Sequence, residues 1–130
     1  MWPVARALKL VDSITELKPQ DAGCIAVSSS HGGISSAQYA LVARPLLSIF
    51  NDAGVGKDKA GVDALDILQS HALAACTVSH ISACIGQAKS TLQSGVVNHC
   101  NLLVRELGVD AGHSCQVVVD HLQKSLRKQS

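Results

Sequence analysis

The chain has 130 residues, of which 47% are hydrophobic and 16% charged, and its formal net charge is +1. This composition excludes a disordered chain, and the length suits one domain, which we expect to cover residues 1–130. The near-neutral charge, with no basic stripe before the short tail at residues 124–128, argues against a nucleic-acid partner, which needs clustered phosphate contacts.

The hydropathy and the cysteine pattern predict a cytoplasmic protein. No segment approaches the ~20 apolar residues of a membrane span, so we expect no membrane partner. The first residues have neither a leading basic region nor a long apolar stretch. The 5 cysteines are spread singly without a CxxC pair, which speaks against a disulfide framework and a zinc knuckle.

The first half of the chain begins with residues 8–17, whose pattern fits a short strand or a helix; we expect an edge strand. Residues 24–27 (CIAV) predict a strand, and the polar segment SSSHGG at 28–33 predicts a loop. Residues 34–43 then have helical spacing, and this helix should end before Pro45, because the residue preceding a proline disfavours the helical region.

The order of strand, loop and helix repeats twice more. Residues 46–50 (LLSIF) predict a buried strand, the Gly-rich loop 51–61 follows, and apolar residues from position 62 onward have helical spacing. Residues 74–78 (AACTV) predict a third strand, followed by a polar loop at 79–90. The next helix should carry one apolar stripe, formed by Leu92, Val96, Cys100, Leu103 and Leu107.

The last segment predicts a helix that begins after Ser114 as N-cap and turns Val118, Leu122 and Leu126 inward, with an edge strand at 117–119 as the alternative. Three consecutive strand and helix units imply parallel strands joined by right-handed crossovers. The predicted fold is therefore a small three-layer, Rossmann-like α/β domain, with a mostly parallel sheet and helices on both faces.

The carboxyl edge of this sheet is the expected site, because parallel strands deliver their following loops to the same edge. If the three clear strands lie in the spatial order 2-1-3, a topological switch point opens beside SSSHGG. A 3-2-1 order abolishes that crevice. Both orders fit the sequence.

Gly32 and Gly33 would let the backbone approach a ligand, and the amides at the start of the next helix would favour a carboxylate or phosphate. The alternative is that the glycines only make a turn while Ser35 or Ser36 caps the helix. The convergence of three polar loops favours the site. The predicted ligand-binding residues are Ser30, Gly32, Gly33, Asn51, Gly54 and Ser82.

Proton transfer is the chemistry that the titratable residues at this edge suggest. His31 and His80 each follow a predicted strand, and an imidazole titrates near neutrality. Asp52 could orient one of them or act as the base, and Lys57 could stabilise developing charge. We therefore predict His31, Asp52, His80 and Lys57 as catalytic residues.

Four other kinds of site fit less well. Residues 51–58 lack the first Gly and the final Ser or Thr of a phosphate-binding P-loop, and SSSHG only imitates the GxSxG nucleophile elbow, with Ser30 as nucleophile. Two histidines and an aspartate could bind a metal, but no compact spacing supports this, so we predict no metal ligands. Cys84, near a helix start, fits a buried apolar role better than a reactive thiolate.

These observations predict an enzyme of hydrolase, lyase or isomerase type that acts on a small anionic metabolite, with no cofactor indicated. The alternative is a noncatalytic small-molecule-binding or regulatory module, or a subunit of that kind. Gly95 inside the predicted third helix suggests close approach of another backbone, which would fit a homo-oligomer.

Overall fold

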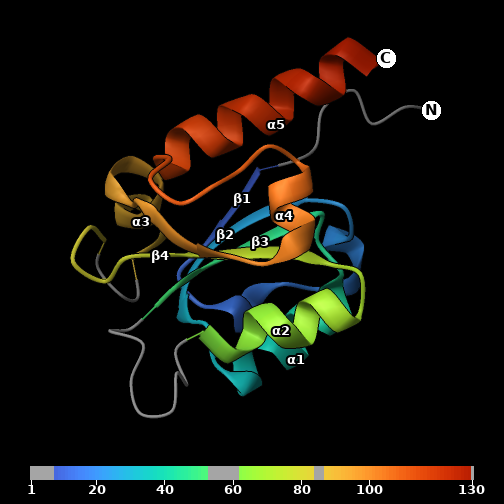
Figure 1. Ribbon diagram of the computed structural model, residues 1–130. Coiled ribbons are helices and arrows are strands. Elements are labelled where there is room, and N and C mark those ends of the chain that lie inside the picture. Colours follow the sequence, from blue (N-terminus) through green and yellow to red (C-terminus); the bar gives the residue numbers. More distant parts are fainter. Residues whose placement is uncertain (1–7, 53–61, 84–86, 130) are drawn as a thin grey trace.

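A computed structural model describes residues 8–52, 62–83 and 87–129, and these form a mixed α/β fold (Figure 1). The described residues build a five-stranded sheet in the spatial order β1-β2-β3-β4-β5. The first four strands are parallel and β5 runs antiparallel to β4. The prediction of a mostly parallel sheet is confirmed. The strands are β1 (Leu8–Val11), β2 (Ile25–His31), β3 (Leu47–Asn51), β4 (Ala74–Val78) and β5 (Val97–Cys100).

Helices lie against both faces of the sheet (Figure 1). They are α1 (Ile34–Ala43), α2 (Asp63–Ser70), α3 (Ala88–Ser94), α4 (Leu102–Glu106) and α5 (Cys115–Gln129), with 3-10 turns η1 (Ile14–Glu16) and η2 (Pro19–Asp21) after β1. Alternate residues of β2 separate the two cores: Ala26 packs with α1 and α2, whereas Ile25 and Val27 pack with buried residues of α4 and α5. Among the described helices, none is long and apolar enough to cross a membrane.

The spatial order of the strands excludes a switch point beside SSSHGG. The three strands expected from the sequence are β2, β3 and β4, and they lie side by side in chain order. This is the 3-2-1 alternative, so the crevice that depended on the 2-1-3 order does not form. The connections from β2 to β3 and from β3 to β4 each lead to the neighbouring strand in the same direction along the sheet. Because both crossovers are right-handed, their helices α1 and α2 cover the same face of the sheet (Figure 1).

SSSHGG is mostly strand, which corrects the predicted loop at 28–33. β2 continues to His31, with a bulge between Val27 and His31 relative to β3. The serines bind neighbouring backbone: the Ser28 hydroxyl donates to Ile49 O at 2.8 Å, and Ser29 and Ser30 bind the segment that follows β1. Hydroxyls that satisfy backbone groups let a polar sequence occupy a buried strand.

The long third helix predicted from the Leu92 to Leu107 stripe is wrong. α3 ends at Ser94, β5 follows, and the chain becomes helical again only in α4. A Cβ on Gly95 would collide with Thr91 O and would lie 3.1 Å from Val78 Cγ1. The close approach expected at Gly95 therefore occurs within this chain. Gly95 gives no support for a contact with a second copy of the protein.

The predictions for the ends of α1, for the start of α5 and for the first segment are confirmed, and the alternative for the cap of α1 is wrong. α1 covers residues 34–43 as expected, and Arg44 ends it in the left-handed region with φ 52°. The N-cap of α1 is Gly33, without a side-chain cap, so the alternative of capping by serine is wrong. Ser114 does cap α5, because its Oγ accepts from Val117 N–H at 3.2 Å. The ambiguous first segment contributes a short edge strand, β1.

Candidate functional site

Asp52 and His80 meet at the carboxyl edge of the sheet. They follow β3 and β4, whose last residues pair in register. The Asp52 side chain is 5% exposed, and its Oδ1 accepts from the His80 backbone N–H at 3.0 Å and from ring Nδ1 at 3.1 Å. An ionised carboxylate has no hydrogen to donate, so this contact requires the proton on Nδ1; when the ring is neutral, Nε2 is then the acceptor. The half-exposed ring is thus held from its buried side.

Asn98 binds the other oxygen of this carboxylate. Its Nδ2 donates to Asp52 Oδ2 at 2.6 Å. Across the register shift between β4 and β5, β4 advances by one residue and β5 by two, so that Asn98 is the extra residue of a β-bulge. Bulges re-aim side chains and are frequent near active sites. Here the bulge brings an edge-strand amide to a carboxylate that follows β3.

Thr77 of β4 contacts Asn98 and so extends the hydrogen-bonded group around Asp52. Its fully buried hydroxyl donates to Asn98 Oδ1 at 2.8 Å and lies 3.4 Å from His99 Nδ1. The amide of Asn98 is therefore bound at both ends, which fixes the side chain toward Asp52. We call His80, Asp52, Asn98 and Thr77 the Asp52 network.

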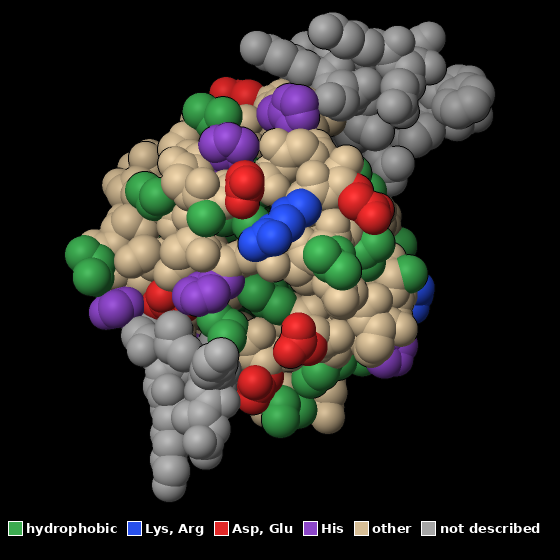
Figure 2. All heavy atoms as spheres, viewed as in Figure 1, with side chains coloured by type: hydrophobic (Ala, Val, Ile, Leu, Met, Phe, Trp, Pro, Cys, Tyr) green, Lys and Arg blue, Asp and Glu red, His purple; other side chains and the backbone are tan. Residues whose placement is uncertain are grey.

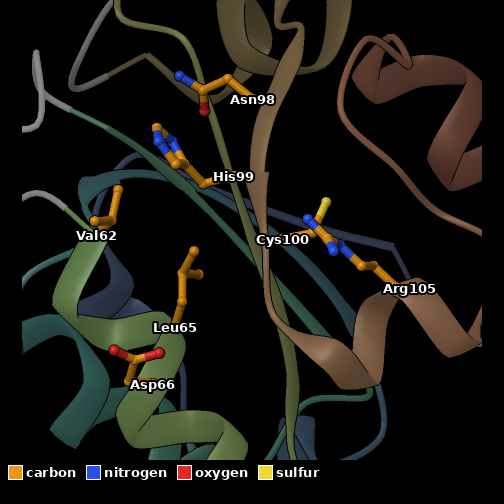
Figure 3. Close-up of a pocket in the computed structure, with 7 residues that line it drawn as sticks. All are labelled: Val62, Leu65, Asp66, Asn98, His99, Cys100 and Arg105. Carbon is orange, nitrogen blue, oxygen red and sulfur yellow. The ribbon is translucent and has the colours of Figure 1, made fainter.

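A cavity of about 330 Å³ adjoins the Asp52 network through Asn98. Figure 3 shows it between α2 on one side and β5 with Arg105 of α4 on the other. Its volume is at the lower end of the range for small-molecule sites. The lining combines apolar, acidic and basic groups: Val62, Leu65, Asp66, Asn98, His99, Cys100 and Arg105.

His31 lies at the same edge but makes a different contact. It pairs with Asn51 in register, and its Nδ1 accepts from Gly33 N–H at 3.2 Å. The Gly32 N–H donates to Asn51 O at 3.0 Å. Both glycine amides thus have acceptors within the protein, so an anion would compete with these bonds. Ser30 accepts from Ile14 N–H at 2.9 Å and so binds η1.

Two other predicted ligand-binding residues hold the loop after β4. Asn51 is fully buried and its Nδ2 donates to Ala83 O at 3.2 Å. The Ser82 hydroxyl donates to Ser79 O at 2.8 Å and accepts from Val96 N–H at 2.9 Å. These contacts position the segment that carries His80. Lys57 and Gly54 lie outside the described residues, and so does Cys84.

The surface and the side-chain clusters limit other kinds of site within the described ranges. On the face shown in Figure 2, the described Lys and Arg side chains do not form a continuous stripe. Within residues 8–52, 62–83 and 87–129, no three His, Cys, Asp or Glu side chains are grouped as metal ligands. Burial raises the pKa of the Cys115 thiol to about 12 and raises that of Cys76 well above its ordinary value.

Asn98 is not among the predicted site residues, because the apolar stripe from Leu92 to Leu107 predicted a helix at this position. Gly95 followed by two β-branched valines was the available signal for a strand. Asp12 is also absent from the predicted site residues; its Oδ1 accepts from Ala88 N–H at 2.9 Å at the start of α3. Asp12 and Ala88 are far apart in sequence, so no local pattern predicts their contact.

Comparison of the chain with protein-family models, with curated proteins and with solved structures finds no match. Function is therefore inferred from the contacts of the Asp52 network and from the cavity beside it.

Proposed function

We propose that the protein is an enzyme that acts on a small anionic metabolite and uses His80 as general acid and base. The supporting observation is the pair formed by the buried Asp52 carboxylate and His80 Nδ1 at 3.1 Å. A carboxylate that binds Nδ1 fixes the tautomer and orients Nε2 for proton transfer to or from a substrate. Asp52 and Asn98 are positioning residues in this proposal. Hydrolysis, elimination and isomerisation can each use such a proton transfer.

We propose that the substrate occupies the cavity beside Asn98. Arg105 of α4 offers a guanidinium that suits a carboxylate or phosphate, and His99 of β5 offers a second polar contact. Val62 and Leu65 give the opposite wall an apolar surface for the rest of a compact molecule. Asp66 lies on the α2 wall, across the cavity from Arg105 (Figure 3), so the β5 and α4 side is the one that favours the anionic group of a ligand with a small apolar body.

The finer fold class and the compartment belong to the same proposal. The helices on both faces of a mostly parallel sheet support a three-layer, Rossmann-like classification (Figure 1). The singly spaced cysteines support the cytoplasm as compartment.

A noncatalytic small-molecule-binding module is the second candidate, and one contact favours it. The Asp52 carboxylate also accepts from the His80 backbone N–H at 3.0 Å, so it fixes the loop as well as the ring. In a binding module, Asp52 would serve only to hold the loop and the ring of His80 in place. The cavity would then bind a ligand without turnover.

The two candidates are distinguished with a panel of small carboxylates and phosphate monoesters, each incubated with the protein and followed by proton NMR. The enzyme proposal predicts turnover of at least one compound, and a loss of about 100-fold or more in His80→Gln. His71→Gln is the matched control, because His71 is exposed at the end of α2. Turnover that is unchanged in His80→Gln would reject His80 as the acid and base. Saturable shifts of Asn98 and Arg105 resonances without turnover would favour the binding module.

A further inference from the structure

We propose that Cys76 and Cys100 are a redox-active pair that forms a reversible disulfide between β4 and β5 when the protein meets a hydroperoxide. The two residues are direct partners across the antiparallel pair, and both are free thiols. This inference does not rest on the proposed acid-base chemistry, because neither cysteine belongs to the Asp52 network; the two proposals share only the cavity, which Cys100 lines.

The hydrogen-bond pattern places the cysteines where a disulfide fits. Asn101 N–H donates to Ala75 O at 3.1 Å, and Ala75 N–H donates to the Asn101 side-chain Oδ1 at 3.2 Å, so these two residues occupy the position of a hydrogen-bonded pair. Hydrogen-bonded and non-hydrogen-bonded pairs alternate along antiparallel strands, which makes the next pair, Cys76 and Cys100, non-hydrogen-bonded. The Cα atoms of such a pair are about 4.5 Å apart, within the range of about 4.4 to 6.8 Å that disulfides span.

Both thiols lie on the same face of the sheet. Residues directly opposite each other on antiparallel strands point to the same side. In agreement, Cys76 belongs to the core cluster under α4 and α5, and Cys100 packs against that cluster. A bond between them therefore requires no strand to turn over.

The two cysteines differ in access, which gives them different roles. Cys76 is fully buried, whereas Cys100 is half-buried and lines the cavity. Figure 3 shows the Cys100 sulfur beside the Arg105 guanidinium. Burial raises the pKa of Cys100, and Arg105 opposes this rise by charge and by a hydrogen bond. A small oxidant entering the cavity therefore meets Cys100 first, as a thiol with a cationic neighbour.

The reaction proceeds in two balanced steps. Cys100 loses its thiol proton and the thiolate attacks one oxygen of hydrogen peroxide; an S–O bond forms, the O–O bond breaks, and the leaving hydroxide takes up that proton to become water, whereas an organic hydroperoxide releases an alcohol in the same step. The Cys76 sulfur then attacks the Cys100 sulfenic acid; the S–S bond forms, the S–O bond breaks, and the thiol proton leaves with the hydroxide as a second water. Two thiols are oxidised and one hydroperoxide is reduced.

Hydrogen peroxide treatment of the full chain, followed by alkylation of free thiols, tryptic digestion and mass spectrometry, tests the proposal. Cys100 falls in peptide 90–105, and Cys76 falls in peptide 60–89 together with Cys84. We expect these two peptides to become linked, and the link to disappear on reduction with dithiothreitol. Cys84→Ser removes the ambiguity, and the link should persist in that variant.

Two further variants sharpen the test. Cys115→Ser should leave the link in place, whereas Arg105→Gln should slow its formation several-fold, because the thiolate of Cys100 loses its cationic neighbour. The linked protein should also melt at a temperature higher by about 5 °C or more, since the bond closes the chain between two strands. The proposal is overturned if Cys84→Ser yields no linked peptide, or if Cys100 links instead to peptide 106–124 or to a second molecule.

Discussion

The Asn98 amide donates to Asp52 Oδ2 at 2.6 Å, and this bond joins an edge strand to the carboxylate that holds His80. The bond depends on a bulge in β5, because an even register would leave no extra residue at this position. A residue remote from Asp52 in sequence thus fixes the orientation of the proposed proton-transfer pair.

Asn98→Ala should lower the free energy of unfolding by about 2 kcal/mol, because hydrogen bonds to charged groups contribute roughly 1.5 to 3 kcal/mol and Asp52 is buried. Urea unfolding of the variant and wild type measures the difference. Gln93→Ala, at an exposed position of α3, is the control and should stay within about 0.5 kcal/mol. Equal losses in the two variants would show that the bond to Asp52 adds nothing.

Asn101→Ala should be more destabilising than Asn98→Ala. The buried Asn101 side chain accepts from Ala75 N–H and Val104 N–H and donates to Leu65 O and Leu73 O. Its removal leaves several buried backbone groups without partners, and each costs about 1 to 3 kcal/mol. We expect a loss of at least about 3 kcal/mol in chemical unfolding. A loss below about 1 kcal/mol would mean that other groups or water replace these bonds.

Two buried serines on neighbouring strands make a matched pair. Ser28 donates to Ile49 O at 2.8 Å, whereas Ser48 Oγ has no hydrogen-bond partner among the described residues. Ser28→Ala should therefore cost about 1 kcal/mol, and Ser48→Ala should be neutral or stabilising, because it removes an unsatisfied hydroxyl. Thermal unfolding of both variants measures the contrast. The reverse order of stabilities would contradict the assigned contacts.

Stability should fall above pH 9 because of the buried thiol of Cys115, whose pKa rises from an ordinary 9.0 to about 12. Below pH 9 the thiol is protonated in both the folded and the unfolded chain. Between pH 9 and 12 the unfolded chain releases this proton while the folded chain retains it, so rising pH favours unfolding. Urea unfolding from pH 8 to 10.5 should show a shallower loss in Cys115→Ala than in wild type. Parallel pH profiles would contradict this role.

Elements with a strong local pattern could be predicted from the sequence. Helix α1 has its expected bounds, because helical spacing that ends before Pro45 is a local signal. Strand β4 has its expected bounds, because a continuous apolar run is also a local signal. The proposed pair of Asp52 and His80 also followed from local reasoning, since each residue comes just after a predicted strand and parallel strands share an edge.

Features set by distant contacts could not be predicted. The serines of SSSHGG resemble a loop until Ile49 O, Asp12 O and Ile14 N–H are placed beside them. The apolar stripe from Leu92 to Leu107 has helical spacing. Residues 97–100 within it nevertheless pair with the edge of β4 and form strand β5. Tertiary pairing overrides such local periodicity.

The orientation of His80 by Asp52 is tested most directly by long-range proton–nitrogen NMR of the histidine rings, at a pH where the rings are neutral. We predict that His80 carries its proton on Nδ1 in the wild type and loses this preference in Asp52→Asn, while His71 is the same in both proteins. A wild-type His80 protonated on Nε2 would contradict the pairing, and with it the proposed use of His80 as general acid and base.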